Sequence, residues 1–174
     1  MSMYNIEKIK NEDDIKEDFT CGISYIDRNI KECYYAHLCR QEMVYLCKLD
    51  NSTVGYIVFS ISELSNAELV DKVEYSFGSN SFGVIYMNYI AIDFNNQHKG
   101  YGSRFLAKFI SEMKDKSKEL PLRCIVINSL KDKVDWYCKR GFRLIESKDD
   151  NPKMFVDLLD KDDIKIIDNY GGIV

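Results

Sequence analysis

Residues 89–106 read YIAIDFNNQHKGYGSRFL and combine a strand, a polar loop and the first turns of a helix. The apolar run at residues 84–92 is rich in β-branched and aromatic residues, which is typical of a strand. Residues 93–97 form a polar loop, and two glycines, Gly100 and Gly102, follow it. The spacing of the next apolar residues predicts a helix that begins near Gly100 and buries one face; these residues are Phe105, Leu106, Phe109, Ile110 and Met113.

A strand, a glycine-rich turn and a helix N-terminus together can bind an anion. The first turn of a helix has unpaired N–H groups and the positive end of the macrodipole. Glycines let a phosphate approach that backbone, because no Cβ stands in the way. We therefore expect a pyrophosphate site here, and an ordinary tight turn is the alternative. The dinucleotide-binding and phosphate-loop glycine patterns do not fit, since position 105 is Phe and no Gly-Lys-Ser/Thr follows.

Residues 122–142 form a second unit of a strand and a helix. Residues 122–128, LRCIVIN, predict a strand, and a short helix is expected after it. Asn128 or Ser129 can cap that helix, and Gly141 stands where a helix commonly ends. Tyr137 lies four residues before Gly141.

Both units resemble motifs of the GNAT N-acetyltransferases. Gln97–Gly102, QHKGYG, is similar to the family's Gln/Arg-x-x-Gly-x-Gly/Ala signature, whose backbone amides hold the pyrophosphate of coenzyme A. Residues 122–142 resemble the second motif, in which a Tyr before the Gly is the general acid. The resemblance implies an α/β (α+β) fold. Its mixed, mostly antiparallel twisted sheet would have about six to seven strands, with about four flanking helices and two splayed central strands.

The resemblance also implies a site, in which acetyl-CoA lies between the splayed strands as co-substrate. Tyr137 would protonate the departing sulfur, and the alternative is a core aromatic beside Trp136. Asn128 would hydrogen-bond the cofactor or cap the helix. The central strand has no carboxylate before Asp93, so the expected base is a water chain ending at Glu42, Glu63 or Tyr89. The remaining expected acetyl-CoA contacts are Ile90, Ala91, Ile92, Gln97, His98, Lys99, Gly100, Tyr101, Gly102 and Ser103.

A segment near the N-terminus is similar to a narrower GNAT branch, which includes toxins that acetylate the amino group of aminoacyl-tRNA. The matching residues are Phe19, Cys21, Gly22, Asp27 and Ile30. That branch commonly carries an Arg where this chain has Asn88-Tyr89, and its members are more basic.

Three functions follow from the resemblances. The first is acetyl transfer from acetyl-CoA to a primary amine of a small molecule or protein. The second is toxin-like acetylation of aminoacyl-tRNA, which would make tRNA a partner. The third is a non-catalytic acyl-CoA sensor, against which the retained Tyr137 and Gln97–Gly102 loop argue. A homodimer is an expectation from the family alone.

Composition limits the other options. The 174 residues suit one acetyltransferase domain over residues 1–160 with a C-terminal tail at 161–174. No run of 18 apolar residues occurs, and a cytoplasmic protein without a membrane partner is expected. The spacing of six cysteines and two histidines fits neither a metal site nor a disulfide framework. The net charge is −4, yet residues 97–143 hold twelve Lys/Arg against five Asp/Glu, which suits a phosphate-bearing cofactor.

The remaining segments predict further elements. Residues 4–9 and 153–158 are expected strands, and residues 43–49 and 53–61 a hairpin turning at Asp50-Asn51. Ser24 is expected to cap a helix, with Asp27 in its first turn. Residues 62–81 are expected to be an irregular insertion with a short helix at 68–73. The tail is expected to fray or to add an edge strand through Ile164, Ile166 and Ile167.

Overall fold

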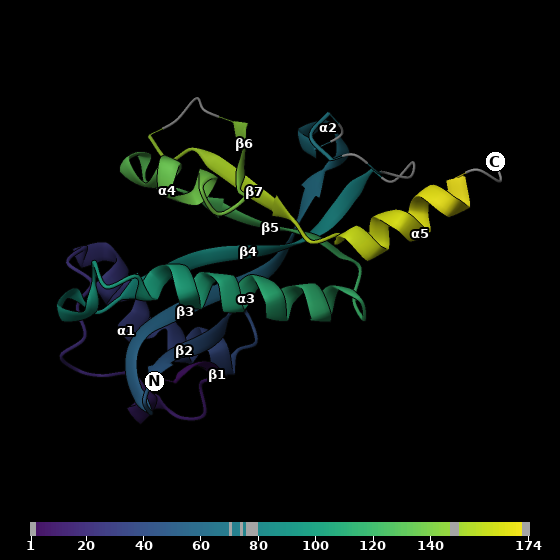
Figure 1. The fold of residues 1–174 in the computed structure, drawn as a ribbon. Helices are drawn as coiled ribbons and strands as arrows, with labels where there is room; N and C mark the ends of the chain where they lie inside the picture. Colours follow the sequence, from purple (N-terminus) through teal and green to yellow (C-terminus); the bar gives the residue numbers. More distant parts are fainter. Residues whose placement is uncertain (1–2, 70, 74, 76–79, 147–149, 172–174) are drawn as a thin grey trace.

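The computed structural model describes residues 3–69, 71–73, 75, 80–146 and 150–171. Within this part of the chain, one sheet contains seven strands: β1 (Tyr4–Lys8), β2 (Met43–Leu49), β3 (Ser52–Ser65), β4 (Ser81–Ile92), β5 (Leu122–Asn128), β6 (Arg143–Glu146) and β7 (Lys153–Asp157). Their spatial order is β1-β2-β3-β4-β5-β7-β6, and only the β4–β5 pair is parallel. The predicted mixed, largely antiparallel sheet is confirmed (Figure 1).

Helices cover both faces of this sheet. Those of the described residues are α1 (Ser24–Leu38), α2 (Asn66–Leu69), α3 (Tyr101–Ser117), α4 (Val134–Cys138) and α5 (Lys161–Gly171), with 3-10 turns η1 (Glu12–Asp14), η2 (Phe94–Asn96) and η3 (Lys131–Lys133). The helix α3 crosses one face, where Phe105 and Phe109 are fully buried. The helix α1 packs Ile26 and Ile30 on the opposite face, against Val44 and Val58. We call these the α3 face and the α1 face.

A bulge in β4 shifts the alternation of its side chains. Val58 of β3 pairs with Tyr89 and Phe59 with Met87, so Asn88 is the extra residue. Met87 lies in the core on the α3 face, as do Ile90 and Ile92 after the bulge. Without the extra residue, the residues beyond position 88 would point to the other face.

Beyond this bulge, β4 and β5 separate. Only residues Gly83–Tyr86 of β4 pair with β5, over Leu122–Val126. Figure 1 shows the two strands diverging on the side where the N-terminal end of α3 lies. The predicted splay between the central strands is therefore confirmed. It opens the middle of the sheet to a ligand.

The hairpin between β2 and β3 turns at Asp50-Asn51, as expected. Both residues have positive φ, 47° and 70°, and Leu49 pairs directly with Ser52. Two successive left-handed residues match the twist of antiparallel strands, and Asn and Asp tolerate that conformation better than most residues.

The tail forms a helix, so both the fraying and the edge-strand predictions are wrong over residues 161–171; residues 172–174 lie outside the described part. The Asp160 carboxylate accepts hydrogen bonds from the N–H groups of Asp162 and Asp163, both at 2.9 Å, and thereby starts α5. Ile164 and Ile167 are half-buried and three residues apart, as on one helix face. Ile166 is exposed, and α5 extends away from the body of the domain (Figure 1).

The predicted irregular insertion at 62–81 is also corrected. The strand β3 continues to Ser65, which pairs with Ser81 at the start of β4. The short helix in this segment is α2, where Leu69 is fully buried, and it begins before the predicted position 68. The sequence did not predict these ends of β3 and β4, because a hairpin that faces solvent has polar, exposed side chains and needs few apolar residues. Residues 70, 74 and 76–79 lie outside the described part.

Among the described helices, none has the length and apolar character needed to cross a membrane.

Candidate active site

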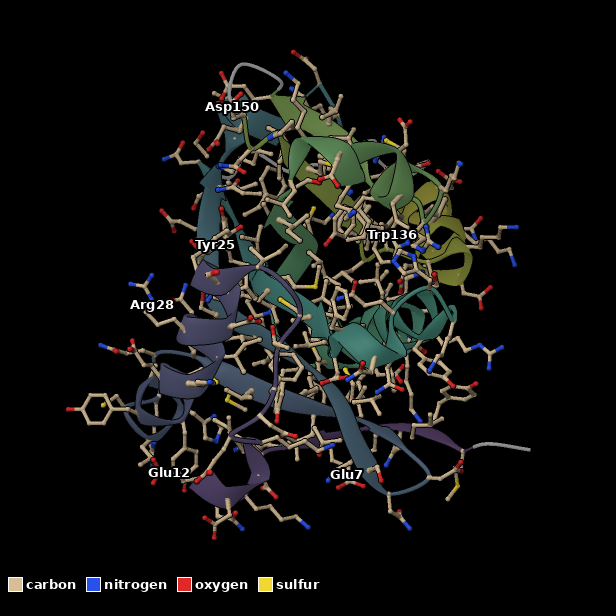
Figure 2. The ribbon with its side chains drawn as sticks, turned by 90° about the vertical axis from the view of Figure 1, so that its left-hand side faces the viewer. Glu7, Glu12, Tyr25, Arg28, Trp136 and Asp150 are labelled. Carbon is tan, nitrogen blue, oxygen red and sulfur yellow. The ribbon has the colours of Figure 1, made fainter. Side chains whose placement is uncertain are left out.

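The separation of β4 and β5 opens into a cavity of about 1150 Å³. The second half of β4, the first turn of α3, and α4 line it, together with the loop before α1. Tyr25 of α1 and Trp136 of α4 both line the cavity and stand on its two sides in Figure 2. It brings together Ile90, Ala91, Ile92, Gln97, His98, Gly100, Tyr101, Gly102, Ser103, Asn128 and Tyr137, whereas Lys99 is not among its lining residues.

The N-terminal end of α3 borders this cavity. Gly100 is the N-cap residue with a φ of +79°, and no side chain caps the helix there. The first N–H groups of a helix have no partner within the helix, and Gly100–Ser103 all line the cavity. A Cβ at Gly102 would stand 3.6 Å from both Ile92 and Trp136, so it would fit the protein but fill space beside the cavity. This geometry suits an anion at the start of α3.

Arg140 adds a cation at the same place, and the sequence analysis missed it. Its guanidinium stacks on the Trp136 ring at 3.9 Å, donates from Nη1 to the Trp136 carbonyl at 2.5 Å, and donates from Nε to the Ser103 hydroxyl at 3.1 Å. These contacts connect α4 to the first turn of α3. An Arg four residues after a Trp was a detectable signal for the cation–π pair, but the partner on α3 was not.

Two side chains of the predicted loop have structural roles. Gln97 donates from Nε2 to the carbonyls of Cys21 (2.8 Å) and Ile92 (3.0 Å). Lys99 donates from Nζ to the Asn95 carbonyl at 2.7 Å. The Gln97 amide and the Lys99 ammonium thus stabilise the shape of the turn.

Tyr137 is at once a core residue and a cavity residue. Its ring packs edge-on against Trp136 and Phe142, at centroid distances of 4.9 and 5.2 Å. Burial raises the pKa of its hydroxyl above the ordinary value near 10, so the group keeps its proton at neutral pH. The chain turns directly after α4 at Gly141, whose φ is +87°, with the Phe142 N–H bonded to the Tyr137 carbonyl. The predicted helix end is therefore confirmed.

Asn128 ends β5 at the cavity and is exposed. Burial raises the pKa of Tyr86, while a hydrogen bond with the Asn128 side chain lowers it in part. The prediction that Asn128 or Ser129 caps the following helix is wrong, because α4 starts only at Val134 after the turn η3. The Ser129 hydroxyl instead donates to the Leu130 carbonyl.

The loop before α1 forms another wall. The Asp27 carboxylate accepts hydrogen bonds from the Cys21 N–H (2.7 Å) and the Thr20 hydroxyl (2.6 Å). The prediction that Ser24 caps α1 is wrong, because Ser24 is the first helical residue and Ile23 takes the cap position. Burial, with a contribution from Asp27, raises the pKa of the Cys21 thiol to about 11, so it is not a nucleophile at neutral pH.

Solved structures with the same architecture were found. A bacterial toxin superposes with a TM-score of 0.76 over 95% of this chain and 97% of its own, at 15% identity. A Tyr-to-Phe mutant of KacT superposes with a TM-score of 0.77 over 94% of this chain and 98% of its own, at 18% sequence identity. AtaT complexed with acetyl-methionyl-tRNAfMet superposes with a TM-score of 0.73 over 95% of this chain and 99% of its own, at 17% sequence identity. The chain has the GNAT fold.

The shared architecture confirms the fold that the family resemblance implies, and KacT and AtaT, both of this fold, are among the structures that superpose. No protein-family model matches the sequence, and no curated protein matches it either. At identities below 20%, the similarity shows a shared fold, so activity must be argued from the cavity.

Proposed function

We propose that this chain is an acetyl-CoA-dependent N-acetyltransferase that acts on a primary amine. The observation that supports it most is the meeting of three features at one cavity: the open edge of β4, the N-terminal end of α3 and the Tyr137 side chain. A further support is AtaT, a protein of the same fold that has been solved with acetyl-CoA. The catalytic domain would span residues 1–160, and its six unpaired cysteines suit the reducing cytoplasm.

In this proposal the chain binds acetyl-CoA mostly through its backbone. The edge of β4 that turns away from β3 would pair with the pantetheine arm as another strand would, at Ile90 and at the N–H of Ile92, since Gln97 already donates to the Ile92 carbonyl. The N–H groups of Gly100–Ser103 would bind the pyrophosphate, with Arg140 beside them. Acetyl-CoA supplies the thioester, whose carbonyl carbon the amine attacks.

Tyr137 would give its proton to the departing sulfur. An ordinary tyrosine has a pKa near 10 and a thiol one near 8.5, so full transfer is uphill by about 2 kcal/mol. Burial raises this barrier, but it also keeps the hydroxyl protonated until negative charge develops on sulfur. An acid placed in this way contributes roughly 10²–10⁴-fold.

The second candidate is acetylation of aminoacyl-tRNA. It is favoured by AtaT, which was solved with acetyl-methionyl-tRNAfMet and also with the antitoxin AtaR. For this chain it would imply a tRNA partner and an antitoxin. Asn88-Tyr89 stands where the toxin branch commonly has an Arg, and a net charge of −4 gives little attraction for tRNA phosphates, so we rank it second.

Calorimetric titration with acetyl-CoA and with CoA tests the main proposal. We expect micromolar binding that Gly102→Glu abolishes, because the new carboxylate would stand against the pyrophosphate at the start of α3. The matched control is Ser62→Glu, which adds the same charge at an exposed position on β3. Absence of wild-type binding at millimolar ligand would show that the loop is only a turn.

A further inference from the structure

A second cavity, of about 830 Å³, lies on the α1 face. The helix α1 lines one side of it, and Ser60 of β3 and Tyr89 of β4 line the other. Two residues, Glu42 and Tyr89, line both this cavity and the cavity between β4 and β5, so the two cavities meet at these side chains. A molecule in the second cavity would therefore reach the opening of the sheet from the α1 face.

The Glu42 carboxylate is held at this junction. Asn88, the extra residue of the β4 bulge, donates from Nδ2 to Oε1 of Glu42 at 2.6 Å. Bulges often re-aim a side chain beside an active site. Tyr89 is held as well, because its hydroxyl accepts a hydrogen bond from Asn29 of α1 at 2.6 Å. In the described part of the chain, the other oxygen of Glu42 has no hydrogen-bond donor, which leaves it available to a ligand.

Glu42 and Tyr137 lie on opposite sides of the opening. Tyr137 belongs to the core cluster beneath α3, whereas Glu42 borders the cavity that α1 covers. Building on the proposed acetyltransferase function, we propose that Glu42 accepts the proton of the acceptor amine, and that the acceptor occupies the cavity on the α1 face.

The proton balance of this reaction is complete. The amine nitrogen forms a bond to the carbonyl carbon, becomes much more acidic, and loses its proton to the Glu42 carboxylate. The carbon–sulfur bond breaks with its electron pair on sulfur, which takes the Tyr137 proton. Exchange with water then returns a proton to Tyr137 and removes one from Glu42. The products are the amide and free CoA.

The cavity favours a cationic alkyl amine. Its charged lining residues are three glutamates, Glu12, Glu32 and Glu42, and one lysine, Lys31. An alkyl amine with a pKa near 10.4 is neutral in only about one molecule per thousand at about pH 7.5, whereas an α-amine with a pKa near 7.7–8.0 is often neutral. For the alkyl amine, the carboxylate holds the ammonium in the cavity, water takes its first proton to leave the neutral nucleophile, and Glu42 takes the second proton after attack. The carboxylate therefore matters more for the alkyl amine.

The test compares Glu42→Gln with wild type, using butane-1,4-diamine and methionine methyl ester as probe acceptors. Gln keeps the size of Glu and can still accept the Asn88 hydrogen bond, so we expect the fold to persist. We expect kcat/KM for the diamine to fall about 10²-fold, with a smaller loss for the ester and unchanged acetyl-CoA affinity. A merely structural role would lower both rates equally. Added formate should partly restore Glu42→Ala, because it can act as the missing carboxylate.

The matched control is Glu63→Gln, on an exposed part of β3 that lines neither cavity, and it should retain wild-type rates. Full activity of Glu42→Gln, equal losses on both probes, or a wild type that binds acetyl-CoA but acetylates neither probe would overturn this inference alone. A wild type that does not bind acetyl-CoA would overturn the proposed function as well.

Discussion

The hydroxyl of Tyr137 can be tested separately from its ring. The ring packs on Trp136 and Phe142, and Phe at this position would keep both contacts. We expect Tyr137→Phe to lower kcat by roughly 10²–10⁴-fold, because the thiolate would leave without a proton. The affinity for acetyl-CoA by calorimetry should not change.

Tyr45→Phe is the matched control for this substitution. Tyr45 is another buried tyrosine of the same core, but it lies outside the cavity and donates to Glu112 at 2.8 Å. Loss of the Tyr45 hydroxyl should lower the free energy of unfolding by about 1 kcal/mol and leave the activity unchanged. Wild-type kcat in Tyr137→Phe would leave the ring as a core aromatic only.

Arg140 connects the two motifs of the site. We expect Arg140→Ala to weaken acetyl-CoA binding about 10–100-fold, since a hydrogen bond to a charged group is worth about 1.5–3 kcal/mol. The loss should shrink as salt is raised, because it is electrostatic. Calorimetry at two ionic strengths measures both effects. Arg143→Ala is the control, because Arg143 stacks on Phe155 and does not line the cavity; equal losses in the two variants would contradict a phosphate contact.

Among the elements, the strand β4 shows which structural features a sequence pattern can predict and which it cannot. Its apolar alternation runs through Ile85 and Met87 and resumes at Ile90 and Ile92, so the break of one residue predicts a bulge. The pattern does not identify the extra residue as Asn88. It also does not reveal that Asn88 meets Glu42, 46 positions away, because periodicity reports burial and not partners.

The C-terminal end of α4 gives a prediction about stability. Gly141 has a φ of +87°, and a Cβ there would be 3.8 Å from Val156, so space is available and only the backbone is strained. Gly141→Ala should therefore lower the free energy of unfolding by about 1–2 kcal/mol. The comparison is Gly102→Ala, where φ is not positive and the Cβ fits; it should keep its stability but bind acetyl-CoA more weakly. Urea titration of both variants checks this, and equal stabilities would contradict it.

For the molecule as a whole, the sequence predicted the helices and strands that have a clear local pattern, but not the contacts between residues far apart in the chain. The strand at residues 122–128 and the helix beginning after Gly100 are where the sequence placed them, because apolar periodicity and glycine turns are local signals. Arg140, Glu42 and the roles of Gln97 and Lys99 depend on partners that only the fold brings near. The helix α5 was missed although its start is a local signal, in which Asp160 and Asp163 accept hydrogen bonds from each other's N–H groups. None of its described side chains is fully buried, so its apolar pattern is weak.

The buried thiols predict how the molecule responds to alkali. Burial raises the pKa of Cys21 to about 11 and those of Cys33 and Cys124 to about 12, and it also raises that of Cys47. An unfolded thiol ionises near pH 8.5, so above this pH the unfolded chain has lost protons that the native state keeps. Stability is then fully present below about pH 8.5 and falls by up to about 1.4 kcal/mol per pH unit for each thiol.

Urea titrations at about pH 7, 9 and 10 in a phosphine reductant would measure this slope. Cys124→Val removes one buried thiol while keeping an apolar side chain on β5, and it should reduce the slope by about 1.4 kcal/mol per pH unit. Cys39→Val, at an exposed cysteine, should leave the slope unchanged. A free energy of unfolding that stays constant between these pH values would mean that the thiols remain accessible to water. The core that positions both sides of the cavity would then be looser than its packing indicates.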